Sequence, residues 1–283
     1  MSDFNLTEAN KKLCDFAKIV NKDKIMQNTD KKKLNSNDLK VGVDLGTSSI
    51  VLTVLNKDNK IIYGNFAYDN AVRDGIVVNF MDSVMILKSL KEKAEKALGV
   101  PLLTAAGAIP PQTGEKSKKI VSNVIEEAGF ICTNVIDEPT AAANFLGIKN
   151  GTVVDIGGGT TGITIFKNQK IVKVIDEPTG GFHMTLVLGG RYHISNKEAE
   201  KLKRNKKKED EVFMVIRPVV EKMASILTSL GSLVTSPIIV VGGATNFSDF
   251  ESAFSSVVGE SVLKPKYPEF VTPLGIALFD TKK

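Results

Sequence analysis

The stretch Val153–Phe166, VVDIGGGTTGITIF, places three consecutive glycines between two runs of apolar, β-forming residues. We expect the two runs to form a buried hairpin. Glycine backbones approach an anion more closely than any residue with a Cβ, so this turn could hold a phosphate through its N–H groups. Asp155 would repel a phosphate unless Mg²⁺ lay between them. The stretch therefore predicts a metal-nucleotide site, with a plain tight turn as the alternative.

A second stretch, Val41–Leu55 (VGVDLGTSSIVLTVL), repeats this design about a hundred residues earlier. It has the same order of features: a strand, an aspartate, a turn of small residues, hydroxyl residues and a second strand. Two such hairpins indicate an internal duplication, in which each half offers one phosphate-binding loop.

Two further stretches complete a recognisable order: Ile136–Ala143 (IDEPTAAA) lies between the hairpins, and Ile238–Asn246 (IIVVGGATN) follows them. The four stretches together resemble the actin, DnaK-type chaperone and sugar-kinase ATPase superfamily. In that superfamily they correspond to phosphate loop one, connecting helix one, phosphate loop two and the adenosine loop. Val271–Leu278 (VTPLGIAL) similarly resembles the second connecting helix.

Within this superfamily the chain is most similar to the EutJ family, the chaperone-like protein of ethanolamine-utilisation operons. The segments that carry this likeness are Val72–Phe80, Asp137–Ala141 and Gly180–His183, and it extends from about Lys40 to the C-terminus. The resemblance implies an ATP-switched accessory protein for the ethanolamine enzymes or their microcompartment. A scaffold protein whose ATPase core has become largely structural is the alternative.

Composition excludes several other classes. The 283 residues, 42% hydrophobic and 24% charged, suit a soluble globular protein with a full core. The net charge of +5 comes mostly from lysines gathered at 31–33 and 201–208, which we interpret as solvated surface rather than a nucleic-acid-binding face. Cys14 and Cys132 provide neither a metal site nor a disulfide framework. No membrane span or signal peptide is evident, so we expect a cytoplasmic chain with no membrane partner.

The N-terminus predicts a short amphipathic helix over Leu6–Val20, which Thr7 could cap. The segment Asn21–Leu39 that follows is polar and lysine-rich, and we expect a flexible linker. Two alternatives stay open for the helix. It could pack back on the body of the protein, or it could resemble the tethered peptides that direct cargo into bacterial microcompartments.

Periodic segments predict the rest of the secondary structure. A short Tyr63–Arg73 interval leaves no room for the outer subdomain that many actin-like proteins insert there. We expect helices over Met81–Leu98, Lys116–Ala128, from Pro139 onward and Val212–Leu230, with strands over Leu102–Ile109 and Ile171–Ile175. The stretch Ser195–Lys208 is expected to be a helix that turns into a lysine run.

The fold class that follows is α/β, a duplicated actin-like (ribonuclease H-like) ATPase fold with reduced outer subdomains and with ATP and Mg²⁺ in the cleft between its lobes. We expect an N-terminal helix and linker, lobe I, lobe II and a returning second connecting helix, over residues 1–39, 40–145, 146–262 and 263–283.

The resemblance also implies roles for individual residues. Asp44 and Asp155 would hold Mg²⁺ and its waters, and Glu138 would help to orient the attacking water. Each carboxylate could instead cap the adjacent helix or turn. Glu200 and Lys203 would contact ribose and base, or form only an exposed i,i+3 pair. The remaining nucleotide-binding positions are Gly46, Thr47, Ser48, Gly158, Gly159, Thr160, Gly180, Gly181, Gly242, Gly243 and Ala244.

Two departures from the superfamily limit the expected activity. Gly162 stands where DnaK-type chaperones carry an acid after the second loop, and the shortened first outer subdomain removes the usual place for their catalytic lysine. We therefore expect a weak Mg-ATPase. A sugar kinase is disfavoured because no insertion forms a substrate pocket, and a filament-forming actin because the outer subdomains are missing.

Overall fold

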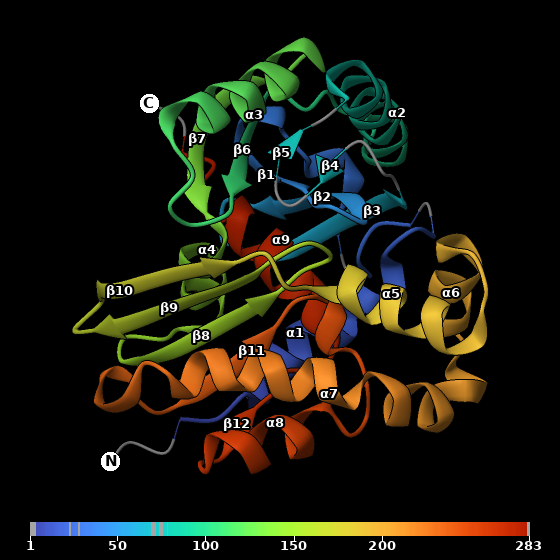
Figure 1. Ribbon diagram of the computed structural model, residues 1–283. Coiled ribbons are helices and arrows are strands. Elements are labelled where there is room, and N and C mark those ends of the chain that lie inside the picture. The colour runs from blue at the N-terminus through green and yellow to red at the C-terminus, as the bar shows by residue number, and fades with distance from the viewer. Residues whose placement is uncertain are drawn as a thin grey trace. The chain divides into compact units, whose positions relative to one another are not determined.

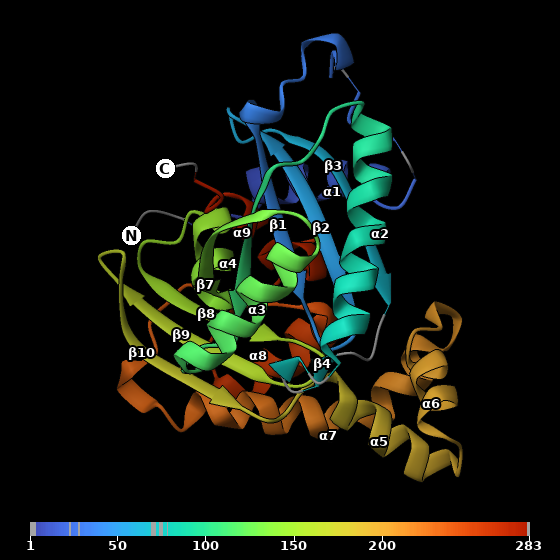
Figure 2. The ribbon, with the colours of Figure 1, turned by 90° about the horizontal axis from the view of Figure 1, so that it is seen from above.

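The computed structural model describes residues 4–22, 24–27, 29–68, 72–73, 76–77 and 79–281. Figures 1 and 2 show the chain from two directions. It divides into two compact units, each with its own sheet: unit 1 comprises Met1–Ile148 with Phe270–Lys283, and unit 2 comprises Lys149–Glu269.

Unit 1 is built on a five-stranded mixed sheet. Its strand order is β3 (Ile61–Tyr68), β2 (Ser49–Asn56), β1 (Leu39–Leu45), β6 (Thr104–Ile109), β7 (Ile131–Asp137). β1, β2 and β3 pair antiparallel, whereas β1, β6 and β7 run parallel. Helices α2 (Phe80–Leu98) and α3 (Glu115–Glu127) supply apolar side chains to the core on one face of this sheet.

The opposite face of the unit 1 sheet carries α4 (Glu138–Leu146) and α9 (Val271–Ala277). A Cβ at Gly42 of β1 would lie 2.6 Å from the Ala277 nitrogen and 2.7 Å from the Pro273 oxygen, so only glycine lets α9 approach this closely. Asp280, just beyond α9, fastens the returning chain to the sheet. Its buried carboxylate accepts hydrogen bonds from the Val41 nitrogen (2.8 Å) and the Thr104 hydroxyl (2.9 Å).

Unit 2 repeats this plan. Its strand order is β10 (Lys170–Glu177), β9 (Thr161–Lys167), β8 (Gly151–Ile156), β11 (Ile238–Val241), β12 (Val262–Leu263). Again the first three strands pair antiparallel and the last three parallel. The core contains α5 (Gly181–Tyr192), α7 (Glu209–Thr228) and α8 (Phe250–Val258), packed against Val154, Ile156 and Ile163 of the sheet.

The matching strand orders confirm the predicted duplication and the actin-like fold class, and both outer insertions are reduced. Between β3 and α2 the described residues form only the short strands β4 (Val72–Arg73) and β5 (Ile76–Val77). Part of the Val72–Phe80 motif falls outside the described residues. Between α5 and β11 the described chain forms α6 (Asn196–Lys203), α7 and the 3₁₀ turns η3 (Lys206–Lys208) and η4 (Gly231–Leu233), with no strand.

Most predicted elements agree with the structure to within a few residues, but one does not. The stretch Ser195–Lys208, expected as a helix that turns into a lysine run, is helical only as far as Lys203, and a separate turn, η3, contains the last three lysines. Polar side chains define both pieces. Ser195 and Glu198 form a capping box at the start of α6, and the Asn205 side chain accepts from the Lys207 nitrogen at the start of η3.

Helix α1 (Thr7–Ile19) packs on unit 1. The Phe16 ring is fully buried, lies edge-on to Phe270 with 5.0 Å between centroids, and occupies the space that a Cβ at Gly64 of β3 would need. The predicted cap is wrong: Thr7 is the first helical residue, and its nitrogen donates to the Asn5 side chain. Of the two alternatives for this helix, the structure contains the packed one.

The segment after α1 is also attached to unit 1. The Asn21 side chain donates to the Phe66 oxygen (3.0 Å) and accepts from its nitrogen (2.7 Å), and the Met26 nitrogen donates to the Ile62 oxygen. Two 3₁₀ turns, η1 (Lys31–Lys33) and η2 (Ser36–Asp38), follow. The described part of this segment therefore runs along unit 1, where we had expected a free linker.

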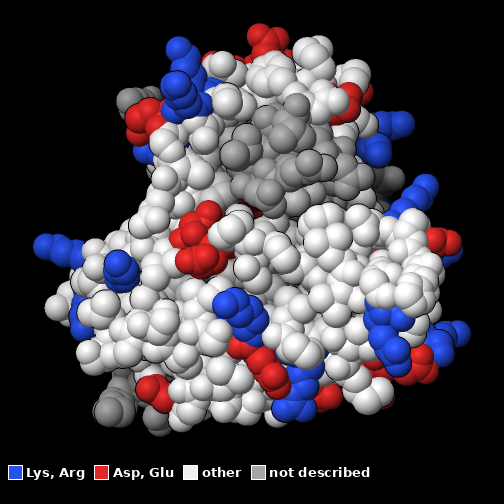
Figure 3. Space-filling model, in the orientation of Figure 1, with Lys and Arg blue, Asp and Glu red and all other residues white. Residues whose placement is uncertain are grey.

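Charged side chains alternate in sign on the face shown in Figure 3, where Lys and Arg stand apart with Asp and Glu among them. Several lysines of the 201–208 run pair locally, as Lys206 does with Glu209 and Lys208 with Glu211, each at 2.9 Å. This arrangement fits the predicted solvated surface. In the described part of the chain, no helix is both long enough and apolar enough to cross a membrane.

Candidate functional site

The glycine turn of unit 2 connects β8 to β9 and is held against the start of α5. The Gly157 nitrogen donates to the Thr160 oxygen (3.0 Å), closing the turn. The Gly181 and Phe182 nitrogens, at the start of α5, donate to the Gly157 oxygen (2.9 Å) and the Gly158 oxygen (2.7 Å).

These bonds orient the peptide groups of the turn. In a trans peptide the N–H points opposite to the carbonyl of the same peptide group. The N–H groups of Gly158 and Gly159 are therefore directed away from α5, and neither donates to an acceptor within the described residues. Two adjacent N–H groups with this orientation suit an anion such as a phosphate.

Gly180 lies in contact with the same turn. A Cβ placed on it would be 2.7 Å from the Gly159 carbonyl carbon, 2.8 Å from the Gly158 oxygen and 2.9 Å from the Gly157 oxygen. Any side chain here would displace the turn. The Gly180 nitrogen also donates to His183 Nδ1 at 3.3 Å, which gives this histidine a local structural role.

Asp155 ends β8 directly before the glycine turn, and only 8% of its surface is exposed. Its Oδ1 lies 2.5 Å from the position that a Cβ would occupy on Gly242. Gly242 has a φ of +92°, which also requires glycine, and its oxygen accepts from the Thr245 hydroxyl (2.8 Å). The predicted adenosine loop, which continues into the 3₁₀ turn η5 (Gly243–Thr245), therefore lies beside the metal-ligand candidate.

The predicted residues of unit 2 converge at one place. A Cβ on Gly181 would be 3.3 Å from the Ala244 Cβ, 3.5 Å from the Gly157 oxygen and 3.5 Å from Lys203 Nζ. Phosphate loop two, the start of α5, the adenosine loop and α6 thus meet at the end of β8.

Asp176 belongs to the same neighbourhood, although sequence reasoning missed it. It lies on β10, paired across the sheet with Gly162. Burial raises the pKa of Asp176 to about 6; a hydrogen bond with Thr160 opposes the shift, and the nearby charge of Asp155 adds to it. Its Oδ1 is buried without a hydrogen-bond partner among the described residues.

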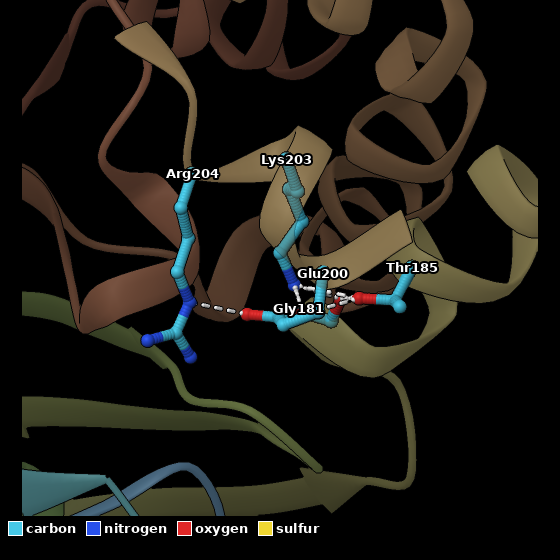
Figure 4. A network of polar contacts seen from close by, with 5 residues as sticks. All are labelled: Gly181, Thr185, Glu200, Lys203 and Arg204. Carbon is cyan, nitrogen blue, oxygen red and sulfur yellow. Dashed lines mark hydrogen bonds and ion pairs between the residues drawn. The ribbon is translucent and has the colours of Figure 1, made fainter. Parts of the chain in front are cut away.

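Glu200 and Lys203 form a network that is already satisfied (Figure 4). Lys203 Nζ donates to the Gly181 oxygen (2.7 Å), to the Thr185 hydroxyl (2.8 Å) and to Glu200 (2.6 Å). An ammonium has three donors, so all of them are used. The other oxygen of Glu200 accepts from Arg204 at 2.6 Å. Burial favours protonation of Glu200, but Lys203, Thr185 and Arg204 together outweigh it and lower the pKa of this carboxyl.

This network changes how the pair would act on a nucleotide. Lys203 would have to give up one of its present acceptors to bind ribose or base directly. In the structure the pair instead joins α6 to the start of α5, which makes it the support of the glycine turn rather than an exposed salt pair.

In unit 1 the equivalent turn, residues 46–48, connects β1 to β2. The Gly46 nitrogen donates to the Ser49 oxygen (3.1 Å), and Asp44 Oδ1 lies 3.8 Å from the position of a Cβ on Gly46. Thr47 and Ser48, partly exposed, complete the turn.

The second acidic position of unit 1 lies at the end of β7. Because β1 and β7 run in the same direction, Asp44 and Glu138 belong to the same edge of the sheet. The cap of α4 is Asp137, whose carboxylate accepts from the Thr140 nitrogen at 2.9 Å. Asp137, rather than Glu138, is thus the N-cap residue of α4.

The residues present fit a magnesium-bound nucleotide. Mg²⁺ is bound through one or two carboxylates together with phosphate oxygens and waters, rather than by a cage made only of protein ligands. No group of three or more His, Cys, Asp or Glu that could hold a metal occurs among the described residues. Asp155 beside the glycine turn, with the buried and unpartnered oxygen of Asp176, supplies the oxygen donors that such an ion prefers.

Comparison with known proteins agrees with this geometry. The family model described as Hsp70 protein matches residues 81–181. The ethanolamine utilization protein EutJ of Salmonella typhimurium is 38% identical over 239 residues, which is 84% of this chain and 84% of that protein. The crystal structure of EutJ from Carboxydothermus hydrogenoformans superposes with a TM-score of 0.90 at 40% identity, covering 97% of this chain and 99% of that one.

A more distant structure supports the fold alone. MreB5 of Spiroplasma citri, solved bound to AMPPNP, has a TM-score of 0.68 at 16% identity and covers 86% of this chain and 96% of that one. From the identity and coverage of its relatives, the chain belongs to the EutJ family of ethanolamine utilization proteins, in the actin and Hsp70 ATPase superfamily.

Proposed function

We propose that this protein binds Mg-ATP through its two hairpin loops and acts as a slow, nucleotide-gated, chaperone-like clamp on the enzymes or microcompartment proteins of ethanolamine utilisation. The observation that carries the proposal is the glycine turn of unit 2. Its Gly158 and Gly159 N–H groups are directed away from α5, beside a nearly buried aspartate and next to a glycine that admits no side chain.

Each candidate residue has a defined task in this proposal. Gly158, Gly159 and the Thr160 hydroxyl bind phosphate oxygens, as Gly46, Thr47 and Ser48 do from unit 1. Gly180 and Gly181 hold the turn in place, and Gly242, Gly243 and Ala244 face the adenosine. Mg²⁺, when bound, neutralises phosphate charge and orients the phosphates. Asp44 and Asp155 hold this ion and its waters.

Slow turnover is part of the proposal. Glu138 is the candidate that orients the attacking water, since Asp137 and not Glu138 caps α4. The chain has glycine at position 162, and the reduced insertion between β3 and α2 leaves no place for a superfamily-type catalytic lysine. A slow ATPase suits a switch, because ATP then stabilises one conformation for long enough to hold a client.

The biological role comes from the family. The relatives are named for ethanolamine utilisation, and we propose the same context here, in the cytoplasm and in association with a microcompartment. A scaffold protein with a structural ATPase core is the alternative. Measuring ATP turnover with and without purified ethanolamine-catabolic enzymes separates the two, because a chaperone-like clamp changes its turnover with a client and a scaffold does not.

Titration calorimetry with ATP, in the presence of Mg²⁺ and of EDTA, tests the binding proposal. We expect Mg²⁺-dependent affinity in the wild type and a loss of about tenfold or more of that dependence in Asp155→Ala. Asp210→Ala, which removes an exposed aspartate of the same unit, is the matched control and should bind as the wild type does. Absence of Mg²⁺-dependent binding at millimolar ATP would refute the proposal.

A further inference from the structure

The strand register of unit 2 places an aspartate on each side of Gly162. On β8, Asp155 is paired with Gly162, and on β10 Asp176 is paired with the same glycine from the other side. Residues paired directly across adjacent strands project from the same face of a sheet. Both carboxylates therefore stand on one face, and Gly162 between them contributes no side chain.

This face is the one opposite the apolar core of unit 2. Along β8 the neighbours of Asp155 are Val154 and Ile156, which point into the core with α5, α7 and α8, and side chains alternate along a strand. Adjacent strands are about 4.8 Å apart, so the α-carbons of Asp155 and Asp176 lie roughly 10 Å apart. A gap of this width between two carboxylates suits a cation that keeps part of its water shell.

The surroundings of Asp176 point to such an ion. One of its oxygens is buried without a donor among the described residues, and Thr160 lies close enough to the carboxyl to influence it. A buried acceptor left unsatisfied is costly, and a second carboxylate nearby adds repulsion. A hydrated cation would remove both costs by supplying donors and positive charge.

We propose that Asp176 accepts hydrogen bonds from the water shell of the nucleotide's Mg²⁺, and so replaces from the neighbouring strand the acid that the chain lacks at position 162. The inference rests on the proposed binding of Mg-ATP and adds a residue to that site. In this proposal, Asp176 on β10 supplies the carboxylate that position 162 on β9 lacks.

The test compares ATP affinity with Mg²⁺ and with EDTA in three proteins: wild type, Asp176→Asn and Glu177→Gln. The control removes one negative charge from the next residue of β10, which is exposed and points to the other face of the sheet. We expect Asp176→Asn to reduce the Mg²⁺-dependent gain in affinity by about tenfold or more, the usual effect of removing a partner of a metal's ligands. Affinity for metal-free ATP should stay the same or rise, because one repulsive charge is gone.

Adding Gly162→Asp to Asp176→Asn moves the carboxylate back to the middle strand, and we expect part of the Mg²⁺ effect to return. A purely structural role of Asp176 would not be rescued in this way. A folded double variant with no recovery would overturn the inference, as would an Asp176→Asn protein that keeps the wild-type Mg²⁺ effect or a control that loses it equally. If the wild type itself shows no Mg²⁺-dependent ATP affinity, the proposed function fails and this inference fails with it.

Discussion

Replacing Phe16 by Ala tests whether α1 is a structural part of unit 1. The ring is fully buried, lies 5.0 Å from the Phe270 ring and fills the space left by Gly64. Truncating a buried phenylalanine to alanine removes its apolar burial and leaves a cavity, which together cost about 3–5 kcal/mol. For a unit of this size each kcal/mol lowers the melting temperature by about 2–4 °C, so we expect a fall of roughly 6–20 °C.

Scanning calorimetry of the full chain measures this change. Lys12→Ala is the matched control on the same helix, because Lys12 forms only an exposed pair with Glu8, and its effect should stay within about 0.5 kcal/mol. An unchanged melting temperature for Phe16→Ala would refute the packed arrangement. The apolar face of α1 would then be available to a partner, and the microcompartment-targeting alternative would gain the support that it lacks in the present structure.

Two further predictions concern unit 2. Gly180→Ala should weaken ATP binding by about tenfold or more in calorimetry, because its Cβ would displace the glycine turn that we propose binds phosphate. The control is Gly190→Ala in α5, whose Cβ would meet nothing within 4 Å, and this change should be neutral or stabilising. Equal ATP affinities in the two variants would contradict the role of the close approach. Burial raises the pKa of Glu269 above its ordinary 4.5. This residue therefore lowers the free energy of unfolding increasingly as the pH rises above 4.5. Glu269→Gln should therefore melt at a higher temperature than the wild type at pH 8 but not at pH 4. An equal difference in melting temperature at both pH values would contradict this assignment.

The sequence determined the hairpins, their order and the duplication. Alternating apolar residues and glycine turns are local signals, since a strand pattern and a position that requires glycine depend on the few residues involved. The two hairpins with their aspartates, and the glycines at 180 and 242, could therefore be located before the fold was known. The predicted helix bounds were wrong where a capping residue interrupts a periodic run, as Asn205 does between α6 and η3.

The tertiary structure decided the partners of those residues. Lys203 could be proposed as a nucleotide ligand from the resemblance of its segment, but two of its three acceptors, the Gly181 oxygen and the Thr185 hydroxyl, are brought to it by the packing of α5 on α6. Likewise, the apolar stripe of α1 was compatible with a free peptide or a packed helix. Only tertiary contacts, such as those of Phe16 with Phe270 and with Gly64, distinguished them.

Asp176 shows most clearly why the sequence alone could not place these contacts. The tight turn at Asn168 and Gln169 pairs Lys170 with Lys167, and continuing that register would place Ile175 opposite Gly162. A β-bulge between Ile171 and Lys173 shifts the pairing by one residue, which brings Asp176 opposite Gly162 instead. A shift of one residue moves every later side chain to the other face of a strand, and no local pattern in the sequence specifies it. The position of this acid beside the glycine turn of unit 2 is thus a product of the folded register.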